Sequence, residues 1–169
     1  MKWPKKVSKS RGKVTGLKPT KIPNDFVLLQ DTREQLPLFT RLPNGLVVKS
    51  CTLHDGDYSV LGMEDVFAIE RKGISDFIGY VGKERKRTVA KMERFAEMEW
   101  VGLVIEASEK DLFGNLDFTL VPAEVIRAAL ISFEVRYGVH IYYAATKDDA
   151  ARWVLDRAIK FWVIKHEVE

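Results

Sequence analysis

The alternation of hydrophobic and polar positions predicts strands in the first part of the chain and helices alternating with strands after it. Apolar, strand-like runs cover residues 26–31, 46–53, 58–61, 66–72, 101–107 and 139–145. Helical spacing of apolar residues predicts helices over 74–81, about 86–98, from Pro122 to Phe133, and after Thr146. Pro122 suits a first helical turn, and Thr146 with Asp149 resembles a capping box. This order implies an α/β sandwich in which helices flank a mixed sheet.

The two runs at 58–61 and 66–72 form a predicted hairpin around the loop 62–65. Pairing that steps outward from this four-residue loop places Asp57 opposite Glu70, and directly opposed residues share a face about 4.5–5.5 Å apart. Lys72 lies two residues beyond Glu70 and points to the same face. Arg71 points to the other face, while its backbone carbonyl still reaches the first one. Two facing carboxylates favour a bound cation, and Mg²⁺ prefers such oxygen ligands.

A divalent ion beside carboxylates and a lysine suits hydrolysis of a phosphodiester. The ion lowers the pKa of bound water and neutralises developing charge, and Lys72 adds a positive charge near the nucleophile. Asp31 ends the first predicted strand and is a candidate third carboxylate. The alternative is a solvated ladder of acids and lysine across a surface hairpin, and spacing alone leaves both interpretations open.

Composition adds a strongly basic N-terminal segment to this picture. The chain has 169 residues, 46% hydrophobic content and a net charge of +3, which suits one compact domain. Residues 1–21 hold eight basic residues and no acid. We predict an unstructured basic arm over 1–23 and a folded domain over 24–169. The arm is either a solvated leader or an electrostatic contact to DNA; the candidate contacts are Lys5, Lys6, Lys9, Arg11 and Lys13.

Several function classes are disfavoured by the same sequence. Cys51 is the single cysteine, so no internal disulfide forms and an intracellular, reducing compartment is expected. No apolar run is long enough to span a membrane, and no secretory signal is present. His54, His140 and His166 have no zinc spacing, and His54 is interpreted as a turn residue. Aromatic platforms for a glycosidase are missing.

Three segments together resemble the nuclease domain of the XPF family of structure-specific endonucleases, which includes the archaeal Hef helicase-nucleases. They are "DTREQLPL" (31–38), "LHDGDYSV" (53–60) and "AIERKGISDFI" (68–78). The resemblance covers roughly residues 25–165. It implies a restriction-endonuclease-like three-layer sandwich, Mg²⁺ or Mn²⁺ at Asp57 and Glu70, and Lys72 as the catalytic lysine. It also implies supporting roles for Asp31, Arg33, Glu34, Arg71 and Asp76.

The family also carries an Arg-x-x-x-Gln-x-x-Arg pattern on the next helix. This chain has Arg87, Lys91 and Arg94 at those positions, so a lysine replaces the glutamine. The three cations fall on one helical face. We expect this face to contact backbone phosphates near the metal; the alternative is an ordinary solvated face.

Other features of the family are not found here. Relatives usually continue into helix-hairpin-helix modules, and no such signature or helicase motif precedes Glu169. Nuclease domains of this family also dimerise through their late helices. The large apolar residues available for a homodimer or heterodimer are Phe133, Tyr137, Trp153, Phe161 and Trp162, and core packing explains them equally well.

The sequence therefore favours an Mg²⁺-dependent DNA endonuclease that cuts branched DNA, flap or fork, in repair, replication or recombination. One alternative is a restriction-type nuclease or four-way-junction resolvase on the same fold. Another is a non-catalytic DNA-binding partner subunit. Such subunits lose the signature acids or lysine, whereas this chain keeps Asp57, Glu70 and Lys72.

Overall fold

A six-stranded mixed sheet forms the centre of the protein, whose computed structural model describes residues 21–114 and 119–167. The strand order is β2-β1-β3-β4-β5-β6, and β3 runs antiparallel to both of its neighbours while the other pairs are parallel. The strands are β1 (Val27–Asp31), β2 (Val47–Cys51), β3 (Tyr58–Val60), β4 (Phe67–Gly73), β5 (Trp100–Glu106) and β6 (Val139–Tyr143).

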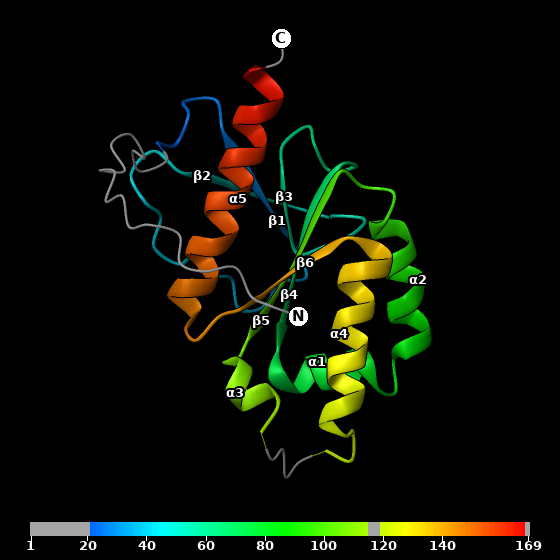
Figure 1. The fold of residues 1–169 in the computed structure, drawn as a ribbon. Helices are drawn as coiled ribbons and strands as arrows, with labels where there is room; N and C mark the ends of the chain where they lie inside the picture. Colours follow the sequence, from blue (N-terminus) through cyan, green and yellow to red (C-terminus); the bar gives the residue numbers. More distant parts are fainter. Residues whose placement is uncertain (1–20, 115–118, 168–169) are drawn as a thin grey trace, which may run out of the picture.

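Helices cover both faces of this sheet, which confirms the predicted α/β sandwich (Figure 1). The helices are α1 (Ile74–Val81), α2 (Arg85–Phe95), α3 (Glu109–Leu112), α4 (Ala123–Tyr137) and α5 (Lys147–Glu167). In Figure 1, α5 lies on one side of the sheet, and α2 and α4 lie on the other. The sequence did not predict α3, because four residues are too short to show a period; Ser108 caps it by accepting the N–H of Asp111.

Two hydrophobic cores, one on each face, fix these layers. β5 contributes to both: Leu103 and Ile105 pack toward α1 and α4, and Val104 packs toward α5. Such two-sided burial is what the continuous apolar run at 101–107 predicted. The five late aromatic residues that were considered for a dimer all pack within the chain, with Phe133 and Trp153 buried and the others partly buried. A dimer therefore stays a prediction.

Two elements end at other residues than the sequence predicts, because hydrogen bonds to distant parts of the chain interrupt the local pattern. The second helix ends at Phe95 rather than near 98, because Trp100 must donate its N–H to Val66 and begin β5. The second strand ends at Cys51, and the N–H of Leu53 turns to the carboxylate of Asp31.

The predicted capping box at the start of α5 is half formed. Thr146 Oγ1 accepts the N–H of Asp149 at 3.1 Å. The carboxylate of Asp149, however, accepts from the Tyr142 hydroxyl at 2.9 Å. Its other oxygen accepts the N–H of Ala145 at 3.3 Å, so the carboxylate bonds one residue before Thr146.

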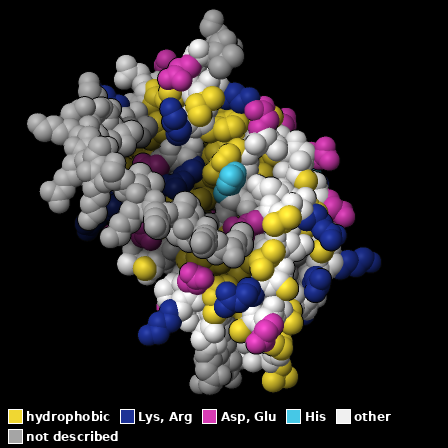
Figure 2. All heavy atoms as spheres, viewed as in Figure 1, with side chains coloured by type: hydrophobic (Ala, Val, Ile, Leu, Met, Phe, Trp, Pro, Cys, Tyr) yellow, Lys and Arg dark blue, Asp and Glu magenta, His cyan; other side chains and the backbone are white. Residues whose placement is uncertain are grey.

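The basic arm cannot be compared with its prediction, since residues 1–20 lie outside the described part of the chain. The candidate contacts Lys5, Lys6, Lys9, Arg11 and Lys13 belong to it. Among the described helices, none combines the length and the apolar character that crossing a bilayer requires. The visible face in Figure 2 shows acidic and basic side chains interspersed rather than gathered into one charged patch.

Candidate active site

Asp57 and Glu70 face each other where β3 and β4 pair. Tyr58 is the partner of Ile69 in this antiparallel ladder. The N–H of Asp57 donates to the carbonyl of Ile69 at 2.8 Å, and the N–H of Arg71 donates to Asp57 Oδ2 at 2.7 Å. This is the register that the four-residue loop predicted. Both carboxylates therefore lie on one face of the hairpin.

Gly56 lets the chain enter β3 at this point. Its φ is +81°, and a Cβ there would lie 3.1 Å from the Cβ of Ala68 and 3.1 Å from the carbonyl oxygen of Ile69. A larger residue at position 56 would have to adopt a left-handed backbone conformation, and its side chain would clash with β4. The glycine thus allows the strand to press against β4 and fixes the position of Asp57.

Glu70 is a buried carboxylate with two ammonium partners. The residue is 1% exposed. Lys72 Nζ lies 2.7 Å from Glu70 Oε1, and Lys91 Nζ, from α2, lies 2.9 Å from both oxygens. A buried charge needs such partners, because desolvation alone costs several kcal/mol. The alternative of a solvated surface ladder is therefore wrong for Glu70.

The pair of carboxylates leaves a negative potential that the lysines only partly neutralise. Burial, followed by the charge of Glu70, raises the pKa of Asp57 to about 7. Burial lowers the pKa of Lys72, but the charge of Glu70 and the hydrogen bond to it raise that pKa above the ordinary lysine value overall. Lys72 is therefore an ammonium at neutral pH, and Asp57 exchanges its proton there.

Three cavities meet at this point, and Lys72 lines all of them. The one of about 370 Å³ contains both carboxylates and basic side chains of α2. The other two measure about 310 and 340 Å³. The arrangement is a carboxylate pair and an ammonium in a depression bordered by arginines and lysines. It can bind a cation at its base and a polyanion along its rim.

Comparison with known proteins places this geometry in a family. The family model described as the ERCC4 domain matches residues 30–156, which include every residue of the site named above. The chain belongs to the ERCC4-domain family. The resemblance to an XPF-type nuclease domain is thereby confirmed.

Two solved structures share the fold of this ERCC4 domain. XPF from Aeropyrum pernix aligns with a TM-score of 0.61 at 21% identity, covering 78% of this chain and 59% of that one. XPF from Aeropyrum pernix in complex with DNA aligns with a TM-score of 0.61 at 20% identity, covering 82% of this chain and 66% of that one. The chain thus spans less than two thirds of either XPF chain. A search of curated proteins found no match.

Asp31 anchors the turn that follows β1 in this ERCC4 domain. Oδ1 accepts the backbone N–H and Nε–H of Arg33, each at 2.7 Å. Oδ2 accepts from Arg33 Nη2 and from the N–H of Leu53, each at 2.8 Å. The hydrogen bond from Arg33 is the largest influence on Asp31 and lowers its pKa to about 2. Both oxygens of Asp31 are therefore engaged within the chain, and its role as a third metal carboxylate stays a prediction.

Arg71 holds the site together from the opposite face, as its alternation with Glu70 predicted. Its guanidinium donates to both oxygens of Glu106 at 2.8 and 2.9 Å, to Glu34 at 3.0 Å and to the carbonyl of Leu36 at 2.7 Å. The side chain joins β4, β5 and the loop after β1. Its role is structural support; its backbone carbonyl stays a predicted metal ligand.

The basic face of α2 is only partly free for phosphate. Lys91 is bound to Glu70, and Arg94 grips the buried carboxylate of Asp55 through Nε and Nη2 at 2.7–3.1 Å. Phosphate contact by these two cations stays a prediction. Arg87 lines two of the cavities, and the exposed Arg33 also lines two. These two arginines remain the predicted phosphate contacts.

Asp76 lies at the rim rather than among the buried acids. It is exposed in the first turn of α1 and lines two of the cavities together with Lys72. Its charge contributes to the raised pKa of Lys72. We infer an electrostatic role toward the lysine.

Sequence reasoning missed Asp55, His54 and Tyr80 as site residues. Asp55 was passed over as part of a turn, but it is 5% exposed and carries bonds to Arg94 and His54. Tyr80 was absent from the predicted apolar stripe of its helix, yet its ring lies 5.2 Å from Lys72 Nζ. In the described chain, its buried hydroxyl has no hydrogen-bond partner. No local signal could show that Asp55 is buried against Arg94 or that the ring of Tyr80 lies beside Lys72.

The donor set fits a small, hard divalent ion. Asp57 and Glu70 offer carboxylate oxygens on one face, which Mg²⁺ and Mn²⁺ prefer. The ammonium of Lys91 already contacts both oxygens of Glu70 at 2.9 Å, so a cation is accommodated there.

Proposed function

We propose that this ERCC4 domain is a metal-dependent endodeoxyribonuclease that hydrolyses one phosphodiester in branched DNA, flap or fork. The observation that carries the proposal is the placement of Asp57 opposite Glu70, with Lys72 Nζ 2.7 Å from Glu70. The family of the chain supports it. DNA repair, replication or recombination inside a cell is the proposed setting.

Asp57 and Glu70 would hold one Mg²⁺ or Mn²⁺, with the carbonyl of Arg71 as a further ligand. When bound, such an ion lowers the pKa of water and neutralises charge on the phosphate. Lys72 acts as a fixed ammonium, since its raised pKa keeps the proton on Nζ. It would orient the attacking water or stabilise the developing negative charge.

DNA would lie over the cavities that meet at Lys72. Arg33 and Arg87 border the cavity that holds both carboxylates and would contact phosphates on either side of the cleaved bond. The basic arm would add contacts of low sequence specificity. One structure that shares this fold is an XPF complex with DNA, which supports DNA as the partner.

The direct experiment compares cleavage of labelled linear duplex, flap, fork and four-way junction. The protein is incubated with Mg²⁺, with Mn²⁺ and with EDTA, and the Asp57→Asn and Glu70→Gln variants are run alongside. We expect cleavage of flap or fork only with a metal. We also expect a loss of at least about 10³-fold in both variants, because the ion binding that supplies the nucleophile is removed.

DNA binding by the two variants is the control, since removing one negative charge should not weaken it. Full activity in EDTA or in either variant would contradict the proposal. Preferred cutting of the four-way junction or of a defined duplex sequence would instead indicate a resolvase or a restriction-type enzyme. Cleavage that requires an added partner protein would indicate a non-catalytic subunit.

A further inference from the structure

His54 is an exposed side chain held in one orientation by a buried carboxylate. Its Nδ1 lies 2.6 Å from Asp55 Oδ2, while 83% of the His54 side chain is accessible. Burial raises the pKa of Asp55, but hydrogen bonds from Arg94 and His54 bring it below the ordinary value overall. Arg94 donates to both oxygens of Asp55, so the carboxylate is an acceptor; Nδ1 of His54 therefore carries a hydrogen toward it, and Nε2 remains for another partner.

The loop that carries His54 is anchored on both sides. The N–H of Leu53 donates to Asp31 Oδ2 at 2.8 Å, and its carbonyl accepts from Arg33 Nη2 at 2.7 Å. Gly56, two residues after His54, is pressed against β4. The anchored loop holds the exposed imidazole in a fixed position, from which it can contact a ligand.

His54 is not needed to neutralise the charge of Asp55. Arg94 already binds both oxygens of Asp55, with Nη2 at 2.7 Å from Oδ1 and Nε at 2.9 Å from Oδ2. The buried acid is thus paired without His54. What the contact from Asp55 adds is the orientation of the ring.

His54 also lies where the reaction lacks a group. It lines the cavity that contains Asp57, Glu70 and Lys72. In sites with two metal ions, one stabilises the attacking oxygen and the other the leaving oxygen. In the proposed site Asp57 and Glu70 hold one ion near the attacking water, and the leaving oxygen can take a proton from a side chain of the same cavity instead.

We propose that His54 is the general acid of this site, which rests on the proposed nuclease function. As the water oxygen forms its bond to phosphorus, the bond from phosphorus to the deoxyribose oxygen breaks. In the imidazolium form both ring nitrogens of His54 carry a proton; the one on Nε2 passes to that leaving oxygen, the neutral ring keeps its hydrogen on Nδ1 toward Asp55, and Nε2 then regains a proton from solvent. Asp55 and Arg94 are positioning residues, because they act through the ring.

The charged surroundings of His54 are mixed in sign. Asp55 is the direct contact. The other titratable or charged groups that line the same cavity are Asp31 and Arg33 from β1 and the turn after it, Asp57, Glu70 and Lys72 from the hairpin, and Arg87, Lys91 and Arg94 from α2.

The test uses DNA in which sulfur replaces the leaving oxygen of the cleaved phosphodiester. A thiolate leaves without a proton, so a missing general acid matters little for such a substrate. Whether the sulfur is placed 3′ or 5′ follows from the ends produced on ordinary DNA. We expect His54→Ala to slow single-turnover cleavage of ordinary DNA by about 10²-fold or more and to leave cleavage of the sulfur substrate nearly unchanged.

A second histidine variant is measured on both substrates as a control. His166→Ala, at the exposed end of α5, is the matched control and should behave as the wild type. Because His54 is exposed, unfolding temperatures should not differ.

Three results distinguish a failure of the proposed nuclease function from a failure of the role proposed for His54. A wild type that cleaves neither substrate overturns the proposed function itself. A wild type that cleaves ordinary DNA no faster than His54→Ala overturns the role of His54 alone. An equal slowing of both substrates by His54→Ala overturns proton donation and assigns the ring to DNA binding.

Discussion

Lys91 Nζ on α2 lies 2.9 Å from each carboxylate oxygen of Glu70 on β4. The contact joins a helix to a strand through a buried ion pair. In the family pattern this position carries a glutamine, which is neutral. The ammonium of Lys91 and a divalent ion would therefore compete for the same oxygens.

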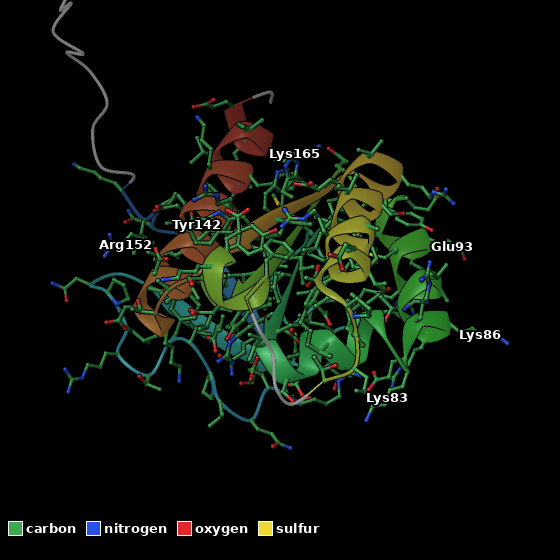
Figure 3. All side chains as sticks on the ribbon, turned by 60° about the horizontal axis from the view of Figure 1, so that its bottom comes forward. Lys83, Lys86, Glu93, Tyr142, Arg152 and Lys165 are labelled. Atoms are coloured by element: carbon green, nitrogen blue, oxygen red, sulfur yellow. The ribbon has the colours of Figure 1, made fainter. Side chains whose placement is uncertain are left out.

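Replacing Lys91 by glutamine should tighten ion binding. The substitution Lys91→Gln removes a cation from Glu70, so we expect the dissociation constant for Mn²⁺ to fall by about 10-fold, which corresponds to about 1.4 kcal/mol. Isothermal titration of the DNA-free protein measures it. Lys86→Gln is the matched control, because Lys86 projects from α2 away from the sheet (Figure 3). Equal or weaker binding by Lys91→Gln would show that no competition exists.

Asp57 gives the protein an unusual dependence of stability on pH. Its pKa is raised to about 7 in the folded protein, so between about pH 4 and 7 the folded state holds a proton that the unfolded state has lost. The free energy of unfolding therefore falls as pH rises through this window. In EDTA, Asp57→Asn should lack this loss and gain on the order of 1–4 kcal/mol relative to the wild type between pH 5 and pH 8.

Urea unfolding at the two pH values measures the effect. Asp31 does not interfere, because its pKa is lowered to about 2 and its contribution is lost only as pH falls below about 4. A difference between wild type and Asp57→Asn that is the same at pH 5 and pH 8 would show that the Asp57 pKa is not raised.

Asp31 should prove to be a structural anchor. The substitution Asp31→Asn removes acceptor capacity from the four hydrogen bonds to Arg33 and Leu53. We expect a loss of about 1–3 kcal/mol in the free energy of unfolding. Mn²⁺ binding should be retained. Ion binding abolished in a folded Asp31→Asn protein would make Asp31 a ligand after all.

Arg71 should matter for stability more than its place in a catalytic signature suggests. Arg71→Gln leaves Glu106 without its bidentate partner and Glu34 without its contact at 3.0 Å. These pairs are partly buried, and we expect losing the charged hydrogen bonds to cost about 1–3 kcal/mol. Chemical unfolding checks this against Arg152→Gln, an exposed residue of α5 that should change stability by less than about 0.5 kcal/mol. Equal stability of the two variants would remove the structural role of Arg71.

The part of the site that lies on one hairpin was predictable from sequence. A four-residue loop fixes the register, and the register alone places Asp57 opposite Glu70 and turns Arg71 to the other face. The sheet and most helices were predictable for the same reason, since their periodicity is local. The structure confirms these elements within a few residues at each end.

The contacts between elements were not predictable. Lys91 and Arg94 were expected to face phosphate, but the packing of α2 against the hairpin brings them to Glu70 and Asp55. Asp31 was expected near the metal, and the turn after β1 brings the guanidinium of Arg33 into contact with its carboxylate. Tertiary packing determines which buried carboxylate each basic side chain can reach, and the sequence alone does not show this.

Electron paramagnetic resonance of Mn²⁺ bound to the DNA-free protein tests the central claim most directly. We predict one bound ion per chain in the wild type, and loss of that ion in both Asp57→Asn and Glu70→Gln at unchanged unfolding temperature. A wild type that binds no ion, or variants that bind Mn²⁺ as the wild type does, would contradict the assignment of these two carboxylates as the metal site.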